Sequence, residues 1–419
     1  MSAAPTLRPV PVALIGLGGV GKAILQQLLA PPLNAKFSVV LIANSKQSLS
    51  LPLPSAAPVT SANFLPILQQ HGQPLDIPSV ISVLAGHPDA PGVLIDSTGS
   101  DAVPALYPTI LGMGVSVVTP NKKGFSGPQE LYDQINAASF PNTRSLVYGE
   151  STVGAGLPIL STLKDLVGTG DEIEKIEGVF SGTLSYIFNE YSKAEGGDVA
   201  FSEVVKVAKD KGYTEPDPRD DLSGTDVARK LTILSRLIPT APALPQGAFS
   251  VPTQSLVPPV LENASTKEEY LSRLAEGDEY FANLRAEAAA EGKVVRYVGV
   301  IDLKEGKVEC KLGKYDKDHA FATALKGSDN IISFTTKRYS PRPLIVQGAG
   351  AGADVTAMGC TVSRVCYAGV EVEQLFLTAL VELKSLLNTA DIPVRPSQDL
   401  RAPPHHCLNV NMFRTGMQQ

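Results

Sequence analysis

The sequence predicts an α/β protein, with a doubly wound parallel sheet of the Rossmann type followed by an α+β domain. Three observations support this prediction. The chain has 419 residues, too many for one compact core. A glycine-rich turn joins an apolar run to a helical pattern near the amino terminus. Three further apolar runs follow before residue 119, and each ends in polar residues.

The composition is that of an ordinary globular protein, with 43% hydrophobic and 19% charged residues. A formal net charge of −6 argues against a nucleic-acid partner. The sequence has neither an apolar run of about 18 residues nor a secretion signal, so we expect a cytoplasmic protein. The cysteines lack paired spacing and are expected to be reduced thiols: Cys310, Cys360, Cys366 and Cys407. A His-His-Cys cluster at 405–407 is more often incidental than a metal site.

The first apolar run, VALI at residues 12–15, leads into GLGGVG and then into a helical pattern. In this setting Gly16 permits a tight turn, Gly18 lets the backbone approach a pyrophosphate, and Gly21 lets the helix pack on the strand. The free N–H groups at the helix amino terminus would face the phosphates. The predicted dinucleotide contacts in this turn are Gly16, Gly18, Gly19, Val20 and Gly21.

The second strand is expected at Phe37–Ala43 and is followed by Asn44, Ser45 and Lys46. A site specific for NAD usually has an acidic residue here to bind the ribose hydroxyls. An amide and a lysine instead tolerate or favour a 2′-phosphate, although a polar turn would look the same. We therefore expect NADP or NAD as cofactor, with NADP favoured, and Asn44 and Lys46 among its contacts.

Two further apolar runs end in DST at residues 96–98 and in TPNKK at residues 119–123. Ligands of open parallel sheets lie beyond the carboxyl ends of the strands, so Thr98 and Lys122 are expected to face the cofactor. Adjacent lysines are ordinarily a solvated turn. The alternative is that Lys122 points back over the nicotinamide.

The loop at residues 149–157 has three glycines around one acidic residue, Glu150. Such a loop exposes carbonyl oxygens, and with one carboxylate these suit a hard monovalent cation. A hinge between domains explains the same pattern equally well.

The segment GYTEPDPRDDLSGTDVARK, at residues 212–230, is dense in charge. Its prolines keep Glu215 extended, and a helix is predicted from about Ser223. The helical period predicts a core stripe of Val227, Leu231, Leu234 and Ile238. It predicts a solvated stripe of Thr225, Arg229, Thr232 and Arg236.

A third row of this helix starts with Asp226 and Lys230 and continues with Ile233 and Leu237, so the two charges should border buried space. The alternative is an exposed i, i+4 ion pair worth about 0.2–0.5 kcal/mol. A lysine beside an apolar pocket can donate and accept protons, since desolvation lowers its pKa while a carboxylate partly restores the charge. Glu215 and Asp226 would then bind a substrate ammonium group, and the aspartates near residue 220 would cap the helix.

The chain resembles the homoserine dehydrogenases, in particular the monofunctional fungal type. The family signature is carried by Gly212, Asp217-Pro218, Asp221-Leu222, Gly224, Asp226 and Lys230. Similar segments are GLGGVG, TPNKK, ESTVGAGLPI, GVFSGTLSYIFNEYS, GSDN and QGAGAGADVTAMG, the last ending at Gly359. The resemblance implies reduction of L-aspartate 4-semialdehyde to L-homoserine with NAD(P)H, on the pathway to threonine, methionine and isoleucine.

The resemblance also implies a role for particular residues. It makes Lys230 the general acid and base, with Lys122 as its catalytic or orienting partner. It implies substrate ligands at Glu215, Asp221 and Asp226, a cofactor contact at Gly352, and a sodium site formed by Glu150 with the carbonyls of Val153, Ala155 and Leu157. It further implies a homodimer.

We expect four regions along the chain. These are a nucleotide-binding domain at 1–149, a substrate-binding, catalytic and dimerisation domain at 150–340, a return to the nucleotide-binding domain at 341–359, and a divergent tail at 360–419. In the tail, a helix is predicted at Val372–Leu387 and a flexible segment after it, although a translated intron or shifted frame would also explain the divergence. Other NAD(P)-dependent oxidoreductases share the fold. A protein that only senses a dinucleotide would have no need of both Lys122 and Lys230.

Overall fold

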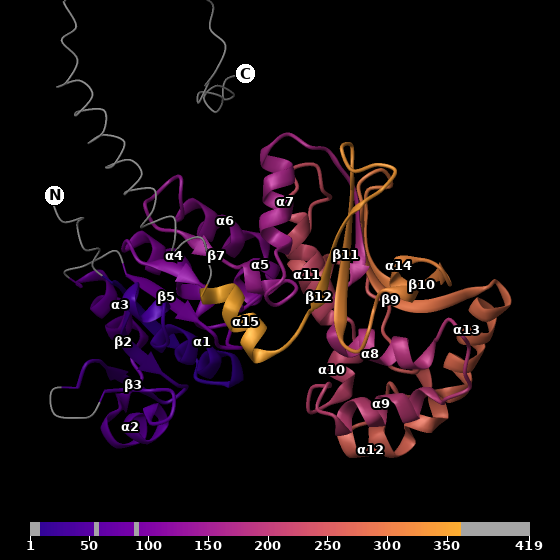
Figure 1. Ribbon diagram of the computed structural model, residues 1–419, viewed down its shortest axis with the longest axis horizontal. Coiled ribbons are helices and arrows are strands. Elements are labelled where there is room, and N and C mark those ends of the chain that lie inside the picture. The colour runs from indigo at the N-terminus through magenta and orange to yellow at the C-terminus, as the bar shows by residue number, and fades with distance from the viewer. Residues whose placement is uncertain (1–8, 54–57, 88–91, 362–419) are drawn as a thin grey trace, which may run out of the picture. The chain divides into compact units, whose positions relative to one another are not determined.

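The computed structural model describes residues 9–53, 58–87 and 92–361, and these residues form two β-sheets (Figure 1). The first sheet has the strand order β4-β3-β2-β1-β5-β6-β7. Its strands are β1 (Val10–Ile15), β2 (Phe37–Ala43), β3 (Gln47–Ser50), β4 (Gln73–Pro74), β5 (Val93–Asp96), β6 (Ser116–Val118) and β7 (Val147–Tyr148). Strands β2, β1, β5, β6 and β7 are parallel, and β3 and β4 extend one edge antiparallel. The predicted parallel sheet is confirmed.

Alternate residues of β1 enter two different cores, as the pleat of a strand requires. Val12 and Leu14 pack in one buried cluster with Ile24 of helix α1, whereas Ala13 and Ile15 belong to the cluster on the other face. The helices of this half are α1 (Gly19–Leu29), α2 (Phe64–His71), α3 (Ile77–Ala85), α4 (Tyr107–Gly112), α5 (Lys123–Ser126) and α6 (Gln129–Ala137). A sheet buried on both faces needs apolar strands, which explains the VALI and FSVVLIA runs.

The second sheet is antiparallel, in the order β10-β9-β8-β11-β12. Its strands are β8 (Ile173–Val179), β9 (Lys293–Asp302), β10 (Lys307–Asp316), β11 (Asp329–Thr336) and β12 (Leu344–Ala349). The helices of this half are α7 (Ile159–Gly168), α8 (Gly182–Tyr191), α9 (Phe201–Asp210), α10 (Pro218–Leu222), α11 (Thr225–Ser235), α12 (Lys267–Arg273), α13 (Asp278–Ala290) and α14 (Ala320–Thr323). Helix α11 packs closely on β9 at Gly299. A Cβ at this position would lie only 2.8 Å from the Leu231 side chain, so glycine allows the close approach. The expected α+β domain is thus present.

The last described helix, α15 (Ala353–Thr361), packs against α1 of the first half. Its Ala357 and Cys360 are buried in the same cluster as Ile24. Two hydrogen bonds join the helices: Gln27 Nε2 donates to the Asp354 carbonyl at 3.0 Å, and Thr361 Oγ1 to Gln27 Oε1 at 2.7 Å. The chain therefore finishes the first core only after the second sheet is complete, although the domain boundaries stay a prediction.

The charged segment before α11 differs from the predicted single helix start. Gly224, at φ +74°, separates the short helix α10 from α11, which begins at Thr225. A Cβ at Gly224 would lie 2.0 Å from the Tyr297 hydroxyl, so both the turn and the packing require glycine. The Asp217 carboxylate caps α10 by accepting from the Arg219 N–H.

Every helix in the described part of the chain is too short or too polar to span a lipid bilayer. Cys310 and Cys360 are buried and are not joined in a disulfide, as expected of reduced thiols. Outside the described residues lie Cys366, Cys407, the His-His-Cys cluster, and the predicted helix at Val372–Leu387.

Candidate active site

A cleft of about 1060 Å³ is lined by half of the predicted site residues, including all of those predicted for catalysis and substrate binding. It is lined by the strand ends after β5 and β6, the 151–155 loop, the start of α8, the 212–215 loop, α10 and α11, and residues 350–356. Such a position, beyond the carboxyl ends of parallel strands, is where open α/β sheets bind ligands. Val20, Thr98, Lys122 and Gly352 line the cleft together with the charged residues of α11.

The glycine turn before α1 has the geometry that dinucleotide binding requires. Gly16 has φ +97°, and a Cβ at Gly21 would lie 1.8 Å from the Gly16 carbonyl oxygen. A Cβ at Gly18 or Gly19 would meet nothing within 4 Å, so the backbone there is open to a ligand. Two glycines thus make the turn possible and two leave room beside it.

A buried polar network fixes the strand ends that face the cleft. The Asp96 carboxylate, fully buried, accepts hydrogen bonds from the Tyr107 hydroxyl at 2.5 Å, the Thr98 N–H at 2.9 Å and Asn121 Nδ2 at 3.2 Å. Burial raises the pKa of Asp96, although these bonds oppose it. The network holds Thr98 and Asn121 in place, and Asn121 immediately precedes Lys122.

Asp226 lies between the two lysines of the cleft. Its Oδ1 is 3.3 Å from Lys122 Nζ, and its Oδ2 is 2.7 Å from Lys230 Nζ. The Asp226 side chain is 46% exposed and that of Lys230 only 7%, so the carboxylate faces the cleft and the amine lies beneath it. The predicted row, with buried Ile233 following Lys230, matches this arrangement.

The Lys230 amine also donates to the Phe180 carbonyl at 2.6 Å. Burial lowers the pKa of Lys230, Asp226 raises it, and the Lys122 charge lowers it again. Burial would raise the pKa of Asp226, but Lys122 and Lys230 outweigh it and hold that pKa below its ordinary value. The Asp226 carboxylate is therefore ionised at neutral pH and lies between the two lysine amines.

Glu215 and Asp221 form an acidic side of the same cleft. Asp221 Oδ2 accepts from the Glu215 backbone N–H at 2.8 Å, which holds the extended Glu215 segment against α10. Burial raises the pKa of Asp221, and the charges of Glu215 and Asp226 raise it further. Asp221 therefore does more than begin a helix, and of the aspartates in this segment it is Asp217 that caps α10.

Glu150 has a structural role that neither sequence interpretation included. Its Oε1 accepts from the Leu160 N–H at 2.8 Å and its Oε2 from the Ser161 N–H at 3.0 Å, both at the amino terminus of α7. The loop that follows turns through Gly154 at φ +75° and Ala155 at φ +56°. Glu150 thus ties the cleft loop to the start of a helix, where a carboxylate is favoured.

Asn44 and Lys46 are not among the residues that line the cleft. The Asn44 side chain accepts from the N–H groups of Lys46 and Gln47, both at 2.8 Å, and so shapes the turn after β2. The Lys46 side chain is exposed. The polar-turn interpretation therefore accounts for Asn44 and leaves Lys46 available to a ligand phosphate.

The stripe of α11 predicted to be solvated is mostly covered, and that prediction was wrong. Thr232 is fully buried and donates to the Ala228 carbonyl. Arg236 donates to the carbonyls of Phe125 and Gly127, each at 2.6 Å, at the end of α5. The helical period correctly grouped these residues on one face of α11, but it could not show that α5 packs against that face.

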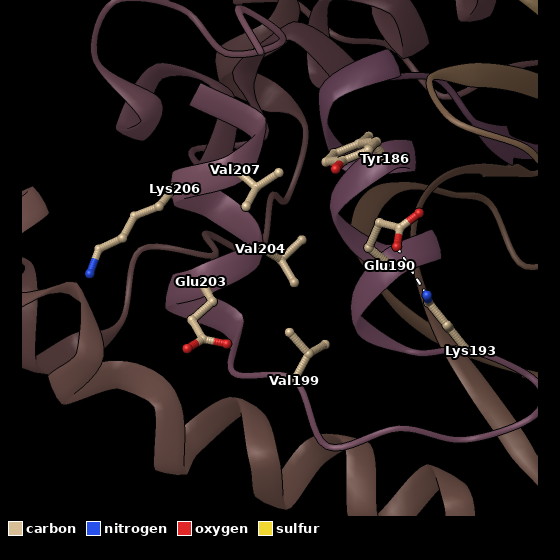
Figure 2. Close-up of a pocket in the computed structure, with 8 residues that line it drawn as sticks. All are labelled: Tyr186, Glu190, Lys193, Val199, Glu203, Val204, Lys206 and Val207. Atoms are coloured by element: carbon tan, nitrogen blue, oxygen red, sulfur yellow. Dashed lines mark ion pairs between the residues drawn. The ribbon is translucent and has the colours of Figure 1, made fainter. Parts of the chain in front are cut away.

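A second hollow, of about 460 Å³, lies between α8 and α9 (Figure 2). Val204 and Val207 of α9 point toward Tyr186 of α8, while Glu190 and Lys193 form an ion pair at its side. The hollow thus pairs apolar walls with charges that neutralise each other. The charged groups suited to catalysis are in the larger cleft.

Sequence reasoning missed two polar residues that support the cleft. Thr183 Oγ1 donates to the Tyr213 carbonyl at 2.6 Å and anchors the 212–215 loop to α8. Asn330 is fully buried and binds the same Phe180 carbonyl as Lys230. An amide directly before the apolar run of β11 was the available signal for Asn330.

Comparison with known proteins matches both halves of the chain to one family. The model of the homoserine dehydrogenase family matches residues 158–362, and that of the homoserine dehydrogenase NAD-binding domain matches residues 16–148. The homoserine dehydrogenase of Emericella nidulans is 49% identical, over 84% of this chain and 96% of its own length. That of Saccharomyces cerevisiae is 46% identical, over 84% of this chain and 95% of its own length.

Solved structures agree with this result. A crystal structure of a Candida auris protein of unknown function has a TM-score of 0.78 and 44% identity, covering 86% of this chain and 99% of its own. A putative homoserine dehydrogenase from Archaeoglobus fulgidus, at 23% identity and a TM-score of 0.63, covers 85% of this chain and 98% of its own and supports the fold. The chain therefore belongs to the homoserine dehydrogenase family, and it is an NAD(P)-dependent oxidoreductase that interconverts L-aspartate 4-semialdehyde and L-homoserine in the biosynthesis of threonine, methionine and isoleucine.

Proposed function

We propose that Lys230 is the general acid of aldehyde reduction and the general base of the reverse reaction. A dihydronicotinamide cofactor, when bound in the cleft, would supply the hydride that reduces the aldehyde carbon. The carbonyl oxygen then becomes an alkoxide and needs a proton, which the Lys230 ammonium donates. In the reverse direction the neutral amine removes the hydroxyl proton of homoserine. The observation that carries this proposal is the buried Lys230 amine beside Asp226 in the cleft.

The hydrogen bonds of Lys230 to the protein leave one of its N–H donors for the substrate. An ammonium group has three N–H donors. Asp226 and the Phe180 carbonyl accept from Lys230 at 2.7 Å and 2.6 Å. Two donors are thus held by the protein, and the third is available to a substrate oxygen in the cleft.

Lys122 is proposed as the partner of Lys230. Both amines contact Asp226, and the Lys122 charge lowers the pKa of Lys230. A second positive charge at this point would also favour the alkoxide that forms during hydride transfer. Lys122 follows β6 at the edge where the nicotinamide is expected, so it links the cofactor to the proton donor.

Glu215, Asp221 and Asp226 are proposed to bind the ammonium group of the amino-acid substrate. Three carboxylates in one cleft attract a cation. Burial is the main cause of the raised pKa of Asp221, and repulsion by Glu215 and Asp226 raises it further. A bound ammonium would relieve that repulsion. The acidic side of the cleft and the lysine side then orient the substrate between them.

The cofactor contacts are proposed at Gly16, Gly18, Gly19, Val20 and Gly21, with Thr98, Lys122 and Gly352 across the cleft. The open space beside Gly18 and Gly19 suits a pyrophosphate. Asn44 and Lys46 are proposed for the ribose end, where the exposed lysine favours the 2′-phosphate of NADP over NAD. Comparing kcat/KM for the two cofactors in the wild type and in a Lys46→Glu variant tests this preference.

A sodium ion is proposed to bind Glu150 and the carbonyls of Val153, Ala155 and Leu157. One carboxylate and three carbonyl oxygens form a donor set suited to a hard cation, and the left-handed turn at Gly154 and Ala155 redirects successive carbonyls. The ion would stabilise the loop that lines the cleft. The melting temperature in sodium chloride, compared with tetramethylammonium chloride at equal ionic strength, tests the site without an activity measurement.

A homodimer is also proposed, formed through the half of the chain that contains the antiparallel sheet. Strand β12 lies at an edge of that sheet, and Ile345 on it is 41% exposed. Sedimentation of the purified protein measures the oligomeric state. The cytoplasmic location stays a prediction.

The role of Lys230 is tested with purified protein, L-homoserine and NADP⁺, following formation of NADPH. We expect Lys230→Ala to lower kcat by about 10²–10⁴-fold, the usual contribution of general acid–base catalysis, with little change in NADP⁺ binding. Lys206→Ala, at an exposed lysine of α9, is the control and should keep full activity. A Lys230→Ala variant as active as the control would rule out Lys230 as the proton donor.

A further inference from the structure

Asn330 and Lys230 share one acceptor. Asn330 Nδ2 donates to the Phe180 carbonyl at 2.9 Å, and Lys230 Nζ donates to the same oxygen at 2.6 Å. Phe180 and Asn330 are both fully buried. A carbonyl oxygen has two lone pairs, so it can serve both donors at once.

The Asn330 amide is held tightly in place. It lies in β11, where its backbone pairs with Gly348 of β12. A Cβ at Gly350 would lie 2.0 Å from Asn330 Cγ, so the backbone of the 350–356 segment packs directly on the amide. Asn330 thus joins three parts of the cleft: the end of β8, the catalytic helix α11 and the segment that contains Gly352.

The Asn330 oxygen gains nothing from its burial. Among the described residues, Asn330 Oδ1 has no hydrogen-bond partner. A buried polar atom without a partner costs about 1–3 kcal/mol, so packing alone would favour an apolar residue here. We therefore attribute the polar side chain to the hydrogen bond that its Nδ2 donates to the Phe180 carbonyl, which is also the acceptor of Lys230.

We propose that Asn330 is a positioning residue of the reaction, which fixes the Phe180 carbonyl and, through it, the direction of the Lys230 amine. The inference rests on the proposed role of Lys230 as proton donor. With its acceptor fixed, Lys230 keeps its third N–H on the substrate oxygen. Asn330 is not among the residues that line the cleft, so it would act on the substrate only through the Phe180 carbonyl and Lys230.

Sharing the acceptor also affects the proton affinity of Lys230. A hydrogen bond from the ammonium to a carbonyl favours the charged form of the lysine. Because Asn330 donates to the same oxygen, its N–H draws electron density from that oxygen and weakens the bond from Lys230. Removing Asn330 should therefore raise the pKa of Lys230 and make the neutral base available only at higher pH.

The test measures kcat and kcat/KM for homoserine oxidation against pH in Asn330→Ala and Asn330→Asp. We expect kcat to fall about tenfold in Asn330→Ala, corresponding to about 1.4 kcal/mol. The midpoint of the pH profile should move upward in both variants. It should move further in Asn330→Asp, because a carboxylate beside the lysine favours its charged form. The KM for NADP⁺ should stay unchanged.

Asn189→Ala is the matched control. Asn189 also has an oxygen without a hydrogen-bond partner among the described residues, and its Nδ2 donates to the Gly327 carbonyl at 3.3 Å and to Ser185 Oγ at 3.2 Å. Asn189 connects α8 to the segment just before β11, but its hydrogen bonds to the described residues do not include one to the Phe180 carbonyl. We expect it to lower the melting temperature and to leave the midpoint of the pH profile where it is.

Two outcomes would overturn the inference: pH profiles of both Asn330 variants that superimpose on wild type, or a shift as large in Asn189→Ala. If Asn330→Ala fails to fold, the nearly isosteric Asn330→Asp still gives the profile. Lys230→Ala, measured in parallel, separates the two proposals. Activity lost in Lys230→Ala without any shift at Asn330 rejects only the positioning role, whereas full activity in Lys230→Ala rejects the role of Lys230.

Discussion

At the residue scale, Asp226 is the group through which Lys122 and Lys230 act on each other. It contacts both amines, and each amine lowers its pKa. Lys230 is the buried member and Lys122 the more exposed one, at 7% and 27% of their side-chain surface. A change at Lys122 should therefore be detected in the titration of Lys230.

We predict that Lys122→Met moves the pH profile of homoserine oxidation upward. The Lys122 charge lowers the pKa of Lys230, so its removal lets that pKa rise toward the ordinary lysine value. Oxidation needs the neutral amine, which then forms at higher pH. The midpoint of log kcat/KM against pH measures the shift, and a downward shift would show that the two lysines are not coupled in this sense.

At the element scale, side chains of α11 contact both ends of the short helix α5. Lys122, the residue before α5, contacts Asp226, and the carbonyls at the end of α5 accept from Arg236. The Arg236 guanidinium also lies over the Tyr132 ring of α6, 4.9 Å from its centre. These contacts set the spacing between the helix that presents Lys230 and the strand end that presents Lys122.

We predict that Arg236→Met destabilises the protein by about 1.5–3 kcal/mol, the usual effect of losing hydrogen bonds to a charged group. It should also lower kcat, because the two lysines lose their fixed spacing. Arg273→Met is the control, since Arg273 pairs with the exposed carboxylates of Glu269 and Glu276 and should change stability much less. Urea unfolding measures both, and equal effects would contradict a special role for Arg236.

The junction between β1 and α1 allows a second prediction at this scale. A Cβ at Gly21 would lie 1.8 Å from the Gly16 carbonyl oxygen, whereas one at Gly18 would meet nothing within 4 Å. Gly21→Ala should therefore lower the melting temperature of the free protein. Gly18→Ala should leave that temperature unchanged and weaken NADP⁺ binding. Thermal melts with and without NADP⁺ distinguish the two effects, and a Gly18→Ala variant with normal binding would place the pyrophosphate elsewhere.

The elements also show where sequence patterns are sufficient. The glycine turn and the row of Asp226 and Lys230 could be predicted, because both depend on neighbours within a few residues along the chain. Arg236 and Thr232 were assigned to solvent, because the helical period cannot show that α5, more than 100 residues earlier, covers that face. The shared acceptor of Asn330 was missed for the same reason, because the Phe180 carbonyl lies 150 residues earlier in the chain. The bonds of Glu150 to Leu160 and Ser161 span only 10 and 11 residues, but they depend on how the glycine-rich loop between them turns back.

At the scale of the whole molecule, α15 completes the first core after the second sheet has formed. It buries Ala357 and Cys360 beside Ile24, and a Cβ at Gly359 would lie 2.2 Å from Ser151 Oγ. Ser151 Oγ in turn donates to the Thr356 carbonyl at 3.0 Å. The helix thus supports both α1 and the loop that lines the cleft.

We predict that a chain ending after Thr361 folds and keeps activity, because it retains all the described contacts of α15. A chain ending after Gly352 should lose several kcal/mol of stability, since it uncovers buried side chains of α1. It should also bind NADP⁺ weakly. Melting temperatures and NADP⁺ affinity of the two truncated chains are the measurements, and equal stability would mean that α15 does not contribute to the core.

The position of α15 has a consequence for synthesis on the ribosome. Amino-terminal domains usually fold as soon as they emerge, but here the core around α1 lacks Ala357 and Cys360 until α15 has left the ribosome. The roughly 200 residues between β7 and α15 take on the order of 10–40 s to translate. During that time the nascent chain exposes the part of this core that Ala357 and Cys360 later cover, so we expect it to be a client of ribosome-associated chaperones.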